Sequence, residues 1–333
     1  MPDRFRAFIL RKQGETVTYE VEQVPFSMLP EGDVLIDVEY SSVNYKDGLA
    51  FQPHGKIVKS YPFIPGIDLS GIVVRSKDPR YRAGDRVLVT GYELGVSHFG
   101  GFSEYASVPG DWLVPLPQGF SLKSAMAIGT AGFTAALSIH RLEASGLSPS
   151  NGPVLVLGAS GGVGSVAVAM LAKRGYEVVA STGKTSEHDL LHRIGAGEVI
   201  SREAVLEDSK PGLGKQRWAG VVDPVGGRSL SAVLSCVQYG GSVATSGLTA
   251  GTEVSATVYP FILRGISLLG IDSVYCPMEQ RLQVWDRIAG DLNPEESLDS
   301  ITNVIRLEEL PETLHQLMEG KHIGRTVVAV SSQ

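Results

Sequence analysis

The chain has 333 residues, of which 43% are hydrophobic and 20% are charged, and its formal net charge is −7. This length and composition predict two domains with full hydrophobic cores, and the acidic balance without Lys/Arg blocks argues against nucleic-acid binding. The sequence has no apolar run near about eighteen residues and no charged-then-apolar leader, so we expect a cytoplasmic protein with neither a membrane span nor a secretory signal.

Short strand patterns separated by Pro and Gly fill the N-terminal part of the chain. They lie at 6–10, 16–20, 33–39, 71–74, 85–89 and 103–108. Such a series predicts a partly open β-barrel. A helical pattern then begins at 121 and covers 123–128 and 130–140, so we expect a domain boundary near its start.

The most informative stretch is 154–164, where a buried-looking apolar run breaks into glycines and continues as small, helix-forming residues. Glycine is needed where a chain turns sharply out of a strand, approaches a pyrophosphate and packs the next helix close to the sheet. A turn of this kind can also be purely structural, but a helix at 165–174 and a strand at 177–181 complete a βαβ unit. The segment therefore predicts a dinucleotide phosphate site.

The end of this second strand, Ser181-Thr182-Gly183-Lys184, indicates which dinucleotide binds. A free ribose 2′-hydroxyl is usually held by an acid at this place, whereas a 2′-phosphate prefers a cation. No acid is present, and Lys184 could meet a phosphate. Most surface lysines are merely solvated, but the missing acid and the added cation both favour NADPH over NADH.

The α/β alternation continues with strands at 219–223 and 241–246 around a helix at 229–237. Loops after such strands line the cofactor crevice of a doubly wound sheet, which nominates 223–226 and 246–248 as neighbours of the nicotinamide; ordinary turns are the alternative. The segment 266–271 predicts an apolar edge strand. Such a strand favours pairing with a second copy, so we expect a homodimer.

The remaining C-terminal patterns are two amphipathic helices at 278–288 and 307–318 and a strand at 324–330. This last strand could complete the N-terminal barrel. Cys236 and Cys276 are the only cysteines, and both are interpreted as packed free thiols. The predicted fold is α/β, with a β-barrel catalytic domain and a Rossmann-type doubly wound parallel sheet.

The order of these features, closed by Gly-Arg-Thr-Val at 324–327, resembles the medium-chain dehydrogenase/reductase superfamily over essentially the whole chain. Within it, SVNYKDGLA at 42–50 and FIPGIDLSG at 63–71 resemble the acrylyl-CoA reductase group of the zinc-free, quinone oxidoreductase-like branch. The resemblance implies a GroES-like catalytic domain at 1–122, a Rossmann NADPH-binding domain at 123–270, and a C-terminal return at 271–333 that completes the catalytic domain.

Zinc alcohol dehydrogenases of this superfamily carry a cysteine near Asn44, a His-Glu pair at the place of Ile67 and Asp68, and then four closely spaced cysteines. This chain has none of these ligands. Amide and isoleucine side chains cannot replace thiolate and imidazole on Zn²⁺. His188 and His192 have ligand spacing, but a solvated polar helix is the better interpretation. We therefore expect no metal.

Without a metal, the reaction that fits the resemblance is NADPH-dependent reduction of the activated C=C bond of a short 2-enoyl thioester such as acrylyl-CoA. The resemblance places Asn44, Tyr45 and Asp47 at the catalytic site, with Tyr45 as donor or hydrogen-bond partner. A merely packed tyrosine is the alternative for Tyr45, and bonds that fix the local turn are the alternative for Asn44 and Asp47. Asp68 is a weaker candidate.

The resemblance also implies a set of cofactor contacts. They are Tyr45, Ser160, Gly161, Gly162, Val163, Ser181, Thr182, Gly183, Lys184, Arg202, Leu248, Ile262 and Ser273. Arg202 either pairs with the adenosine phosphate or caps its own segment. Arg325 either approaches the cofactor phosphates or anchors its strand in a surface ion pair. An NAD(P)H:quinone oxidoreductase and a non-enzymatic dinucleotide-binding regulatory protein stay open as alternative functions.

Overall fold

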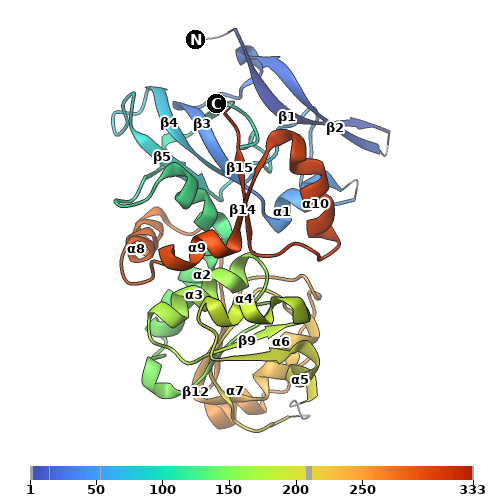
Figure 1. The fold of residues 1–333 in the computed structure, drawn as a ribbon, viewed down its shortest axis with the longest axis vertical. Helices are drawn as coiled ribbons and strands as arrows, with labels where there is room; N and C mark the ends of the chain where they lie inside the picture. Colours follow the sequence, from blue (N-terminus) through green and yellow to red (C-terminus); the bar gives the residue numbers. More distant parts are fainter. Residues whose placement is uncertain (1–2, 15, 53, 208–211, 332–333) are drawn as a thin grey trace. The chain divides into compact units, whose positions relative to one another are not determined.

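The computed structural model describes residues 3–14, 16–52, 54–207 and 212–331, and the chain divides into two compact units (Figure 1). Unit 1 comprises Met1–Thr130, Val274–Leu282 and Thr302–Gln333. Unit 2 comprises Ala131–Ser273 and Gln283–Ile301. The second part of unit 2 differs from the expected C-terminal return, which assigned all of 271–333 to the catalytic domain.

Contacts of two side chains explain why Gln283–Ile301 lies in unit 2. Trp285 stacks on Phe133 with ring centroids 6.1 Å apart. The Arg287 guanidinium lies 2.7 Å from the Glu143 carboxylate. An amphipathic pattern predicts such a helix but does not tell which of two cores it covers.

Unit 1 is built mainly of strands. Its elements are β1 (Arg4–Gln13), β2 (Thr16–Pro25), β3 (Val34–Ser42), α1 (Tyr45–Phe51), β4 (Asp68–Ser76), β5 (Arg86–Thr90), β6 (Tyr105–Val108), β7 (Val114–Pro115), β14 (Thr302–Arg306), α10 (Leu310–Met318) and β15 (Arg325–Ala329). Short 3-10 turns cover Phe26–Met28, Gly110–Trp112 and Leu307–Glu309. The strands predicted from the sequence are thereby confirmed.

The larger sheet of unit 1 has the order β14-β15-β3-β4-β5-β7, with β6 also paired to β3, and β1 and β2 form a hairpin of their own. One of its pairings joins the N-terminal and C-terminal parts of the chain, since Val327 of β15 lies opposite Ser42 of antiparallel β3. Alternate strand residues point into one core, for example Val34, Ile36 and Val328. The C-terminal strand therefore completes the N-terminal sheet, as expected.

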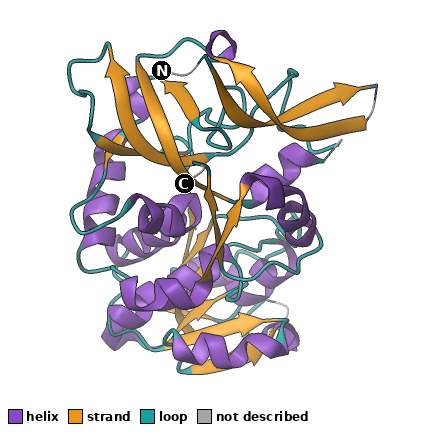
Figure 2. Ribbon diagram, turned by 45° about the horizontal axis from the view of Figure 1, so that its top comes forward, coloured by secondary structure: helices purple, strands orange, loops and turns teal. Residues whose placement is uncertain are grey.

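Unit 2 alternates strands and helices along the chain. Figure 2 colours the helices purple and the strands orange. Its elements are β8 (Val154–Val156), α3 (Gly162–Lys173), β9 (Val178–Thr182), α4 (His188–Arg193), β10 (Glu198–Ser201), α5 (Arg202–Glu207), β11 (Trp218–Asp223), α6 (Gly227–Leu234), β12 (Val237–Thr245), α7 (Tyr259–Arg264), β13 (Ser267–Gly270) and α9 (Glu295–Ile301). Pro149–Asn151 and Thr185–Glu187 form 3-10 turns.

The sheet of unit 2 has the order β10-β9-β8-β11-β12-β13, and all of its pairings are parallel. This is the strand order of a dinucleotide-binding doubly wound sheet, which reverses between β8 and β11. The Rossmann-type prediction is confirmed. The apolar segment predicted as an edge strand is β13, at one end of the sheet.

The boundary between the units falls inside two helices, α2 (Leu122–Ala144) and α8 (Met278–Ala289), so each helix contributes residues to both units. Within the described residues, α2 alone is long and apolar enough to cross a membrane, but 83% of its apolar window is buried inside the protein. Its backbone is interrupted at Gly129, with φ 52° and ψ −159°. The two helical patterns at 123–128 and 130–140 are therefore two segments joined by a kink.

Helix α1 was not anticipated from the sequence because it is short and contains Gly48. The glycine has a tertiary reason: a Cβ there would lie 2.5 Å from the Met318 Sδ of α10. Packing of α1 on α10 thus stabilises a segment whose own pattern is weak. Strand β14 was also missed, since three of its five residues are polar and only Ile305 is buried.

Candidate active site

The glycine turn of unit 2 links the end of β8 to the start of α3. Gly158 adopts φ +55°, a left-handed conformation that favours glycine. A Cβ on Gly164 would lie 2.3 Å from the Gly158 carbonyl oxygen, so only glycine lets α3 begin this close to the turn. A Cβ on Gly161 would meet only that same oxygen, at 3.3 Å. The backbone at 161 is therefore open on its outer side, as a pyrophosphate site requires.

The carboxyl end of β9 lies against this turn, and two cations, Lys184 and Arg202, lie beside it. The Ser160 and Thr182 hydroxyls are 2.9 Å apart, and Thr182 Oγ1 also accepts the Lys184 backbone N–H. A Cβ on Gly183 would lie 2.9 Å from Arg202 Nη2, so the guanidinium covers this glycine. Partial burial lowers the pKa of Lys184, and the nearby positive charge of Arg202 lowers it further, while Glu187 opposes them. Two like charges held together favour an anionic ligand.

The carboxyl ends of β12 and β13 border a cavity of about 510 Å³. Residues 245–248 and 270–272 line it, including the predicted Leu248. The Ser246 hydroxyl is buried and finds no hydrogen-bond partner among the described residues. A buried, unpaired hydroxyl at the ligand-binding edge of the sheet fits a polar group of a bound molecule.

Asp223 holds the neighbouring loop in place. Its carboxylate accepts the Val225 and Gly226 backbone N–H groups at 2.9 and 2.8 Å, and the Thr245 hydroxyl at 2.9 Å. Burial raises the pKa of Asp223, and these hydrogen bonds oppose the rise. The loops after β11 and β12 are therefore tied together at the edge where the sequence predicts the nicotinamide.

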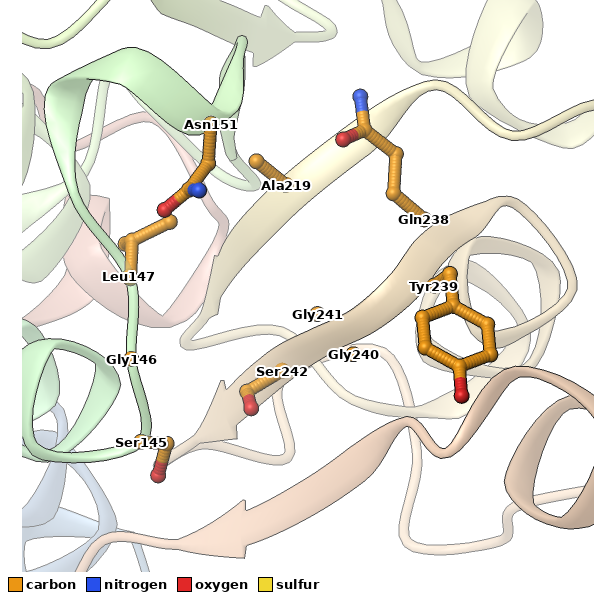
Figure 3. Close-up of a pocket in the computed structure, with 10 residues that line it drawn as sticks. All are labelled: Ser145, Gly146, Leu147, Asn151, Ala219, Gln238, Tyr239, Gly240, Gly241 and Ser242. Atoms are coloured by element: carbon orange, nitrogen blue, oxygen red, sulfur yellow. The ribbon is translucent and has the colours of Figure 1, made fainter.

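A second pocket of unit 2 lies near the opposite ends of the strands (Figure 3). Ala219 at the start of β11 and Gln238, Tyr239 and Ser242 in the first part of β12 line it. Parallel sheets bind ligands at their carboxyl ends, so this pocket is not the dinucleotide site.

Unit 1 contains a buried polar cluster centred on Asp68. Its carboxylate accepts the Ser42 hydroxyl at 2.6 Å, the Asn44 amide at 2.7 Å and the Thr130 N–H at 2.9 Å, together with the Thr130 hydroxyl. A Cβ on Gly129 would lie 2.6 Å from Asp68 Oδ2, so the kink of α2 is shaped to this carboxylate. In the sequence, Asp68 is a candidate by its location alone, and no pattern there indicates Gly129 or Thr130.

Arg325 is the positive member of this cluster and is 1% exposed. Its guanidinium donates to the Ala127 and Val43 carbonyls at 2.9 and 3.1 Å and to the Ser42 hydroxyl at 2.9 Å. Burial lowers the pKa of Arg325, and Asp68 and Asp47 oppose that shift. The surface ion pair considered for Arg325 is therefore wrong, since the side chain anchors β15 from the inside. Its contact with cofactor phosphates stays a prediction.

The predicted catalytic residues lie at the start of α1. Asp47 is buried and accepts the Asn44 and Ile67 backbone N–H groups at 2.9 and 3.0 Å. Burial raises the pKa of Asp47 to about 7, helped by the negative charge of Asp68. Asn44 and Asp47 make hydrogen bonds that hold the local backbone in place, whereas the Tyr45 side chain is 36% exposed. Tyr45 is thus the member of this group that can reach a ligand.

The structure brings most of the predicted cofactor residues of unit 2 to one edge of its sheet. The glycine turn includes residues 160–163, and residues 181–184 and Arg202 lie beside it. Leu248 lines the neighbouring cavity. Ile262 lies on α7, where its side chain is exposed, and Ser273 is the last residue before the return to unit 1. Their roles, like the other site assignments, stay predictions.

No group of three or more His, Cys, Asp or Glu side chains is arranged to hold a metal ion in the part of the chain that the structure describes. His192 Nδ1 lies 2.9 Å from the Ala196 carbonyl oxygen at the end of α4. At the place of the zinc-binding cysteine, the Asn44 amide is bonded to Asp68.

Two protein-family models match the chain. The alcohol dehydrogenase GroES-like domain matches residues 30–118, and the zinc-binding dehydrogenase matches residues 162–289. The first match falls in unit 1, and the second begins at the first residue of α3.

Two curated relatives are similar over nearly the whole chain. YhfP of Bacillus subtilis (strain 168), provisionally named a quinone oxidoreductase, is 58% identical over 98% of this chain and 99% of its own. The acrylyl-CoA reductase AcuI of Ruegeria pomeroyi is 48% identical over 98% of this chain and 100% of its own.

Two solved structures have the same fold and differ in their bound dinucleotide. The YhfP structure, with NAD bound, is 57% identical with a TM-score of 0.96 over 98% of this chain and 100% of that one. The yhdH oxidoreductase of Salmonella enterica, in complex with NADP, is 45% identical with a TM-score of 0.95 over the same shares.

Proposed function

Since this chain belongs to the medium-chain dehydrogenase/reductase superfamily, in its zinc-free, quinone oxidoreductase-like branch, we propose that it is an NADPH-dependent reductase of a short 2-enoyl thioester such as acrylyl-CoA. The observation that carries the proposal is the bonding of Asn44. Its amide donates to Asp68 and its oxygen lies 3.4 Å from Arg325 Nη1, so this position supports Tyr45 and offers no metal ligand.

The preference for NADPH rests on the pair formed by Lys184 and Arg202. Lys184 follows the end of β9, where NAD-binding sheets place an acid, and the Arg202 guanidinium, from the start of α5, lies against Gly183 at the same place. NADP in the Salmonella relative supports this preference, whereas NAD in the YhfP structure does not. The open backbone at Gly161 and the unpaired Ser246 hydroxyl fit the pyrophosphate and the nicotinamide half respectively.

NADPH, when bound, supplies a hydride for the β-carbon of the thioester. Negative charge then develops on the thioester oxygen, and the α-carbon takes a proton. The Tyr45 hydroxyl donates a hydrogen bond to that oxygen, which lowers the energy of the transition state. Asn44 and Asp47 are positioning residues, because the bond from the Asn44 N–H to Asp47 fixes the turn that presents Tyr45.

A quinone is the second candidate substrate, favoured by the 58% identity with YhfP. Reduction of a quinone also needs a hydride and a hydrogen-bond donor, so the same residues would serve both reactions.

Oxidation of NADPH in the presence of acrylyl-CoA, a naphthoquinone or a simple aldehyde separates these functions. We expect turnover with acrylyl-CoA. Turnover with the naphthoquinone alone would show that the thioester assignment is wrong. No turnover with any of the three would favour a dinucleotide-binding regulatory protein.

The enzyme acts as a homodimer in the cytoplasm. The dimer is supported by β13, which leaves an apolar strand at the end of the sheet of unit 2. The location rests on the composition of the chain, in which the two described cysteines are free thiols.

A further inference from the structure

Tyr275 is another exposed tyrosine of unit 1. Its side chain is 60% exposed, and its hydroxyl donates to the Glu93 carboxylate. The other oxygen of Glu93 accepts the Ser97 hydroxyl. These hydrogen bonds lower the pKa of Glu93, so the carboxylate is charged at neutral pH and the bond from Tyr275 is charge-assisted.

The segments that carry Glu93 and Tyr275 are joined by a buried arginine. Arg281 is 0% exposed and donates to the Thr90 carbonyl at 2.7 Å and to the Val274 carbonyl at 3.1 Å. It therefore bridges the residue before Tyr275 and the strand that ends just before Glu93. A buried cation is costly unless hydrogen bonds satisfy it, so this bridge fixes both segments.

Tyr92 adds a third link between the same segments. Its N–H donates to the Val274 carbonyl at 3.0 Å, and its ring lies under the Arg281 guanidinium at 4.6 Å and stacks on Trp112. The backbone of Tyr92 adopts φ +54°, which is strained for a residue with a Cβ. Strained backbone conformations of this kind occur preferentially at functional sites, where the surrounding packing maintains them.

The pair formed by Glu93 and Tyr275 lies beside the predicted catalytic segment. The Gly91 N–H, two residues before Glu93, donates to the Ile67 carbonyl at 3.4 Å, and the Ile67 N–H donates to the Asp47 carboxylate of α1 at 3.0 Å. Lys46, which directly follows Tyr45 in α1, and Lys59 both lower the pKa of Glu93, in agreement with this placement. Two ammonium groups at this place favour a substrate with an anionic carrier, such as the phosphates of a coenzyme A thioester, over a neutral quinone.

We propose that Tyr275 is a substrate-contacting residue, whose ring packs against the planar conjugated acyl group of the thioester. Because the hydroxyl is bound to Glu93, the ring face is the surface that Tyr275 presents. Glu93, Tyr92 and Arg281 are positioning residues that hold this ring in one orientation. The identification of the substrate as a thioester rests on the proposed function, whereas the contact between the Tyr275 ring and the substrate does not.

The test compares Tyr275→Ala, Tyr275→Phe and Glu93→Gln with Tyr239→Ala as the matched control, since Tyr239 is an exposed tyrosine of unit 2. We expect Tyr275→Ala to raise the KM for acrylyl-CoA, and the Kd for acrylyl-CoA in the absence of NADPH, about tenfold, with the KM for NADPH unchanged within about twofold. Tyr275→Phe and Glu93→Gln keep the ring but remove the hydrogen bond that holds it. Each should raise the KM and the Kd for the thioester by about threefold and leave the Tm unchanged. Tyr239→Ala should match the wild type.

Binding of acrylyl-CoA, without NADPH, to Tyr275→Ala as tightly as to the wild type, measured by calorimetry, would overturn the proposal. An equal rise in the KM for NADPH, or a fall in Tm that parallels the KM changes, would also overturn it by assigning Tyr275 a structural role. If the wild type reduces the naphthoquinone but not acrylyl-CoA, the thioester assignment fails. The same variants then decide the ring contact through the KM for the naphthoquinone.

Discussion

Four donors converge on the Asp68 carboxylate, from Ser42, Asn44 and both the N–H and the hydroxyl of Thr130. The Arg325 guanidinium donates to the Ser42 hydroxyl, so Ser42 is a hydrogen-bond partner of both Arg325 and Asp68. Breaking a buried charge cluster by removing one member typically costs about 3–5 kcal/mol, because the remaining charge is left without compensation. This cluster therefore stabilises the seam where the C-terminal strand meets the N-terminal sheet.

Replacement of Lys184 tests the choice of dinucleotide. Lys184→Asp places a carboxylate where the 2′-phosphate is expected, beside Arg202. We expect the KM for NADPH to rise by about tenfold or more and the KM for NADH to change by less than about threefold, measured by initial rates. Lys215→Asp makes the same charge change on an exposed loop and should leave both constants near the wild type. Equal effects of Lys184→Asp on both cofactors would reject the phosphate contact.

Burial of Asp47 makes stability depend on pH. Its pKa in the folded protein is about 7, above the usual value of 3.8, so the folded state binds the proton more tightly than the unfolded state. The stability contributed by this proton is complete below the unfolded pKa and is lost as the pH rises through about 7. Each pKa unit of difference corresponds to about 1.4 kcal/mol.

Urea denaturation from pH 4 to 8 measures this contribution. The free energy of unfolding of the wild type should fall with pH more steeply than that of Asp47→Asn, which lacks the titrating group. Asp299→Asn, on the exposed side of α9, serves as the control and should keep the slope of the wild type. An identical slope in Asp47→Asn and the wild type would contradict the raised pKa.

The start of α3 shows how one helix depends on a few backbone positions. Gly158 turns the chain with a positive φ, and Gly164 lets the first turn of the helix lie against the Gly158 carbonyl. Both requirements could be read from the sequence, because glycines at this spacing after an apolar strand have a known steric purpose. The kink of α2 could not, because the reason for Gly129 is a carboxylate that is distant in the sequence.

Gly164→Ala tests this close approach. The added methyl group would lie 2.3 Å from the Gly158 oxygen and 2.7 Å from the Ala159 Cα, so α3 must shift away from the turn. We expect a loss of about 1–3 kcal/mol in the free energy of unfolding, measured in urea, and a higher KM for NADPH. At Gly197 an added Cβ makes only an ordinary contact, 3.7 Å from the Val178 oxygen. Gly197→Ala should therefore cost less, and a cost equal to that of Gly164→Ala would argue against the steric reason.

At the scale of the whole molecule, exposed apolar side chains concentrate on the β13 side of unit 2. Val258, Ile262 and Leu263 are more than half exposed on and before α7, and Leu268 of β13 is 38% exposed. Exposed apolar patches near an unpaired strand edge typically mark an interface between protein copies. These residues support the homodimer expected from the sequence of the edge strand.

Leu268→Lys tests the dimer. A charge on β13 should oppose burial of this strand against a second copy, so we expect light scattering to find the wild type dimeric and this variant monomeric. Leu282→Lys is the matched control, because Leu282 is 39% exposed on α8. Dissociation by both variants alike, or by neither, would count against an interface on β13.

The sequence by itself determined most of the strands and the longer helices, the glycine turn and the absence of an acid at the end of β9. These features depend on local patterns, in which hydrophobic periodicity and the steric freedom of glycine act over a few residues. Helix α1, the polar strand β14 and the placement of α8 were not predictable in this way, since each depends on the surface against which it packs.

Only the tertiary structure decided how the candidate sites are assembled. The bonds from Ser42, Asn44 and Thr130 to Asp68 join segments up to 62 residues apart. The bond from Tyr275 to Glu93 spans 182 residues. No sequence pattern encodes such contacts, because they arise where strands and loops from distant segments share one buried space. The glycine turn thus predicts a dinucleotide from local chemistry alone, whereas the groups proposed to recognise the substrate become neighbours only through folding.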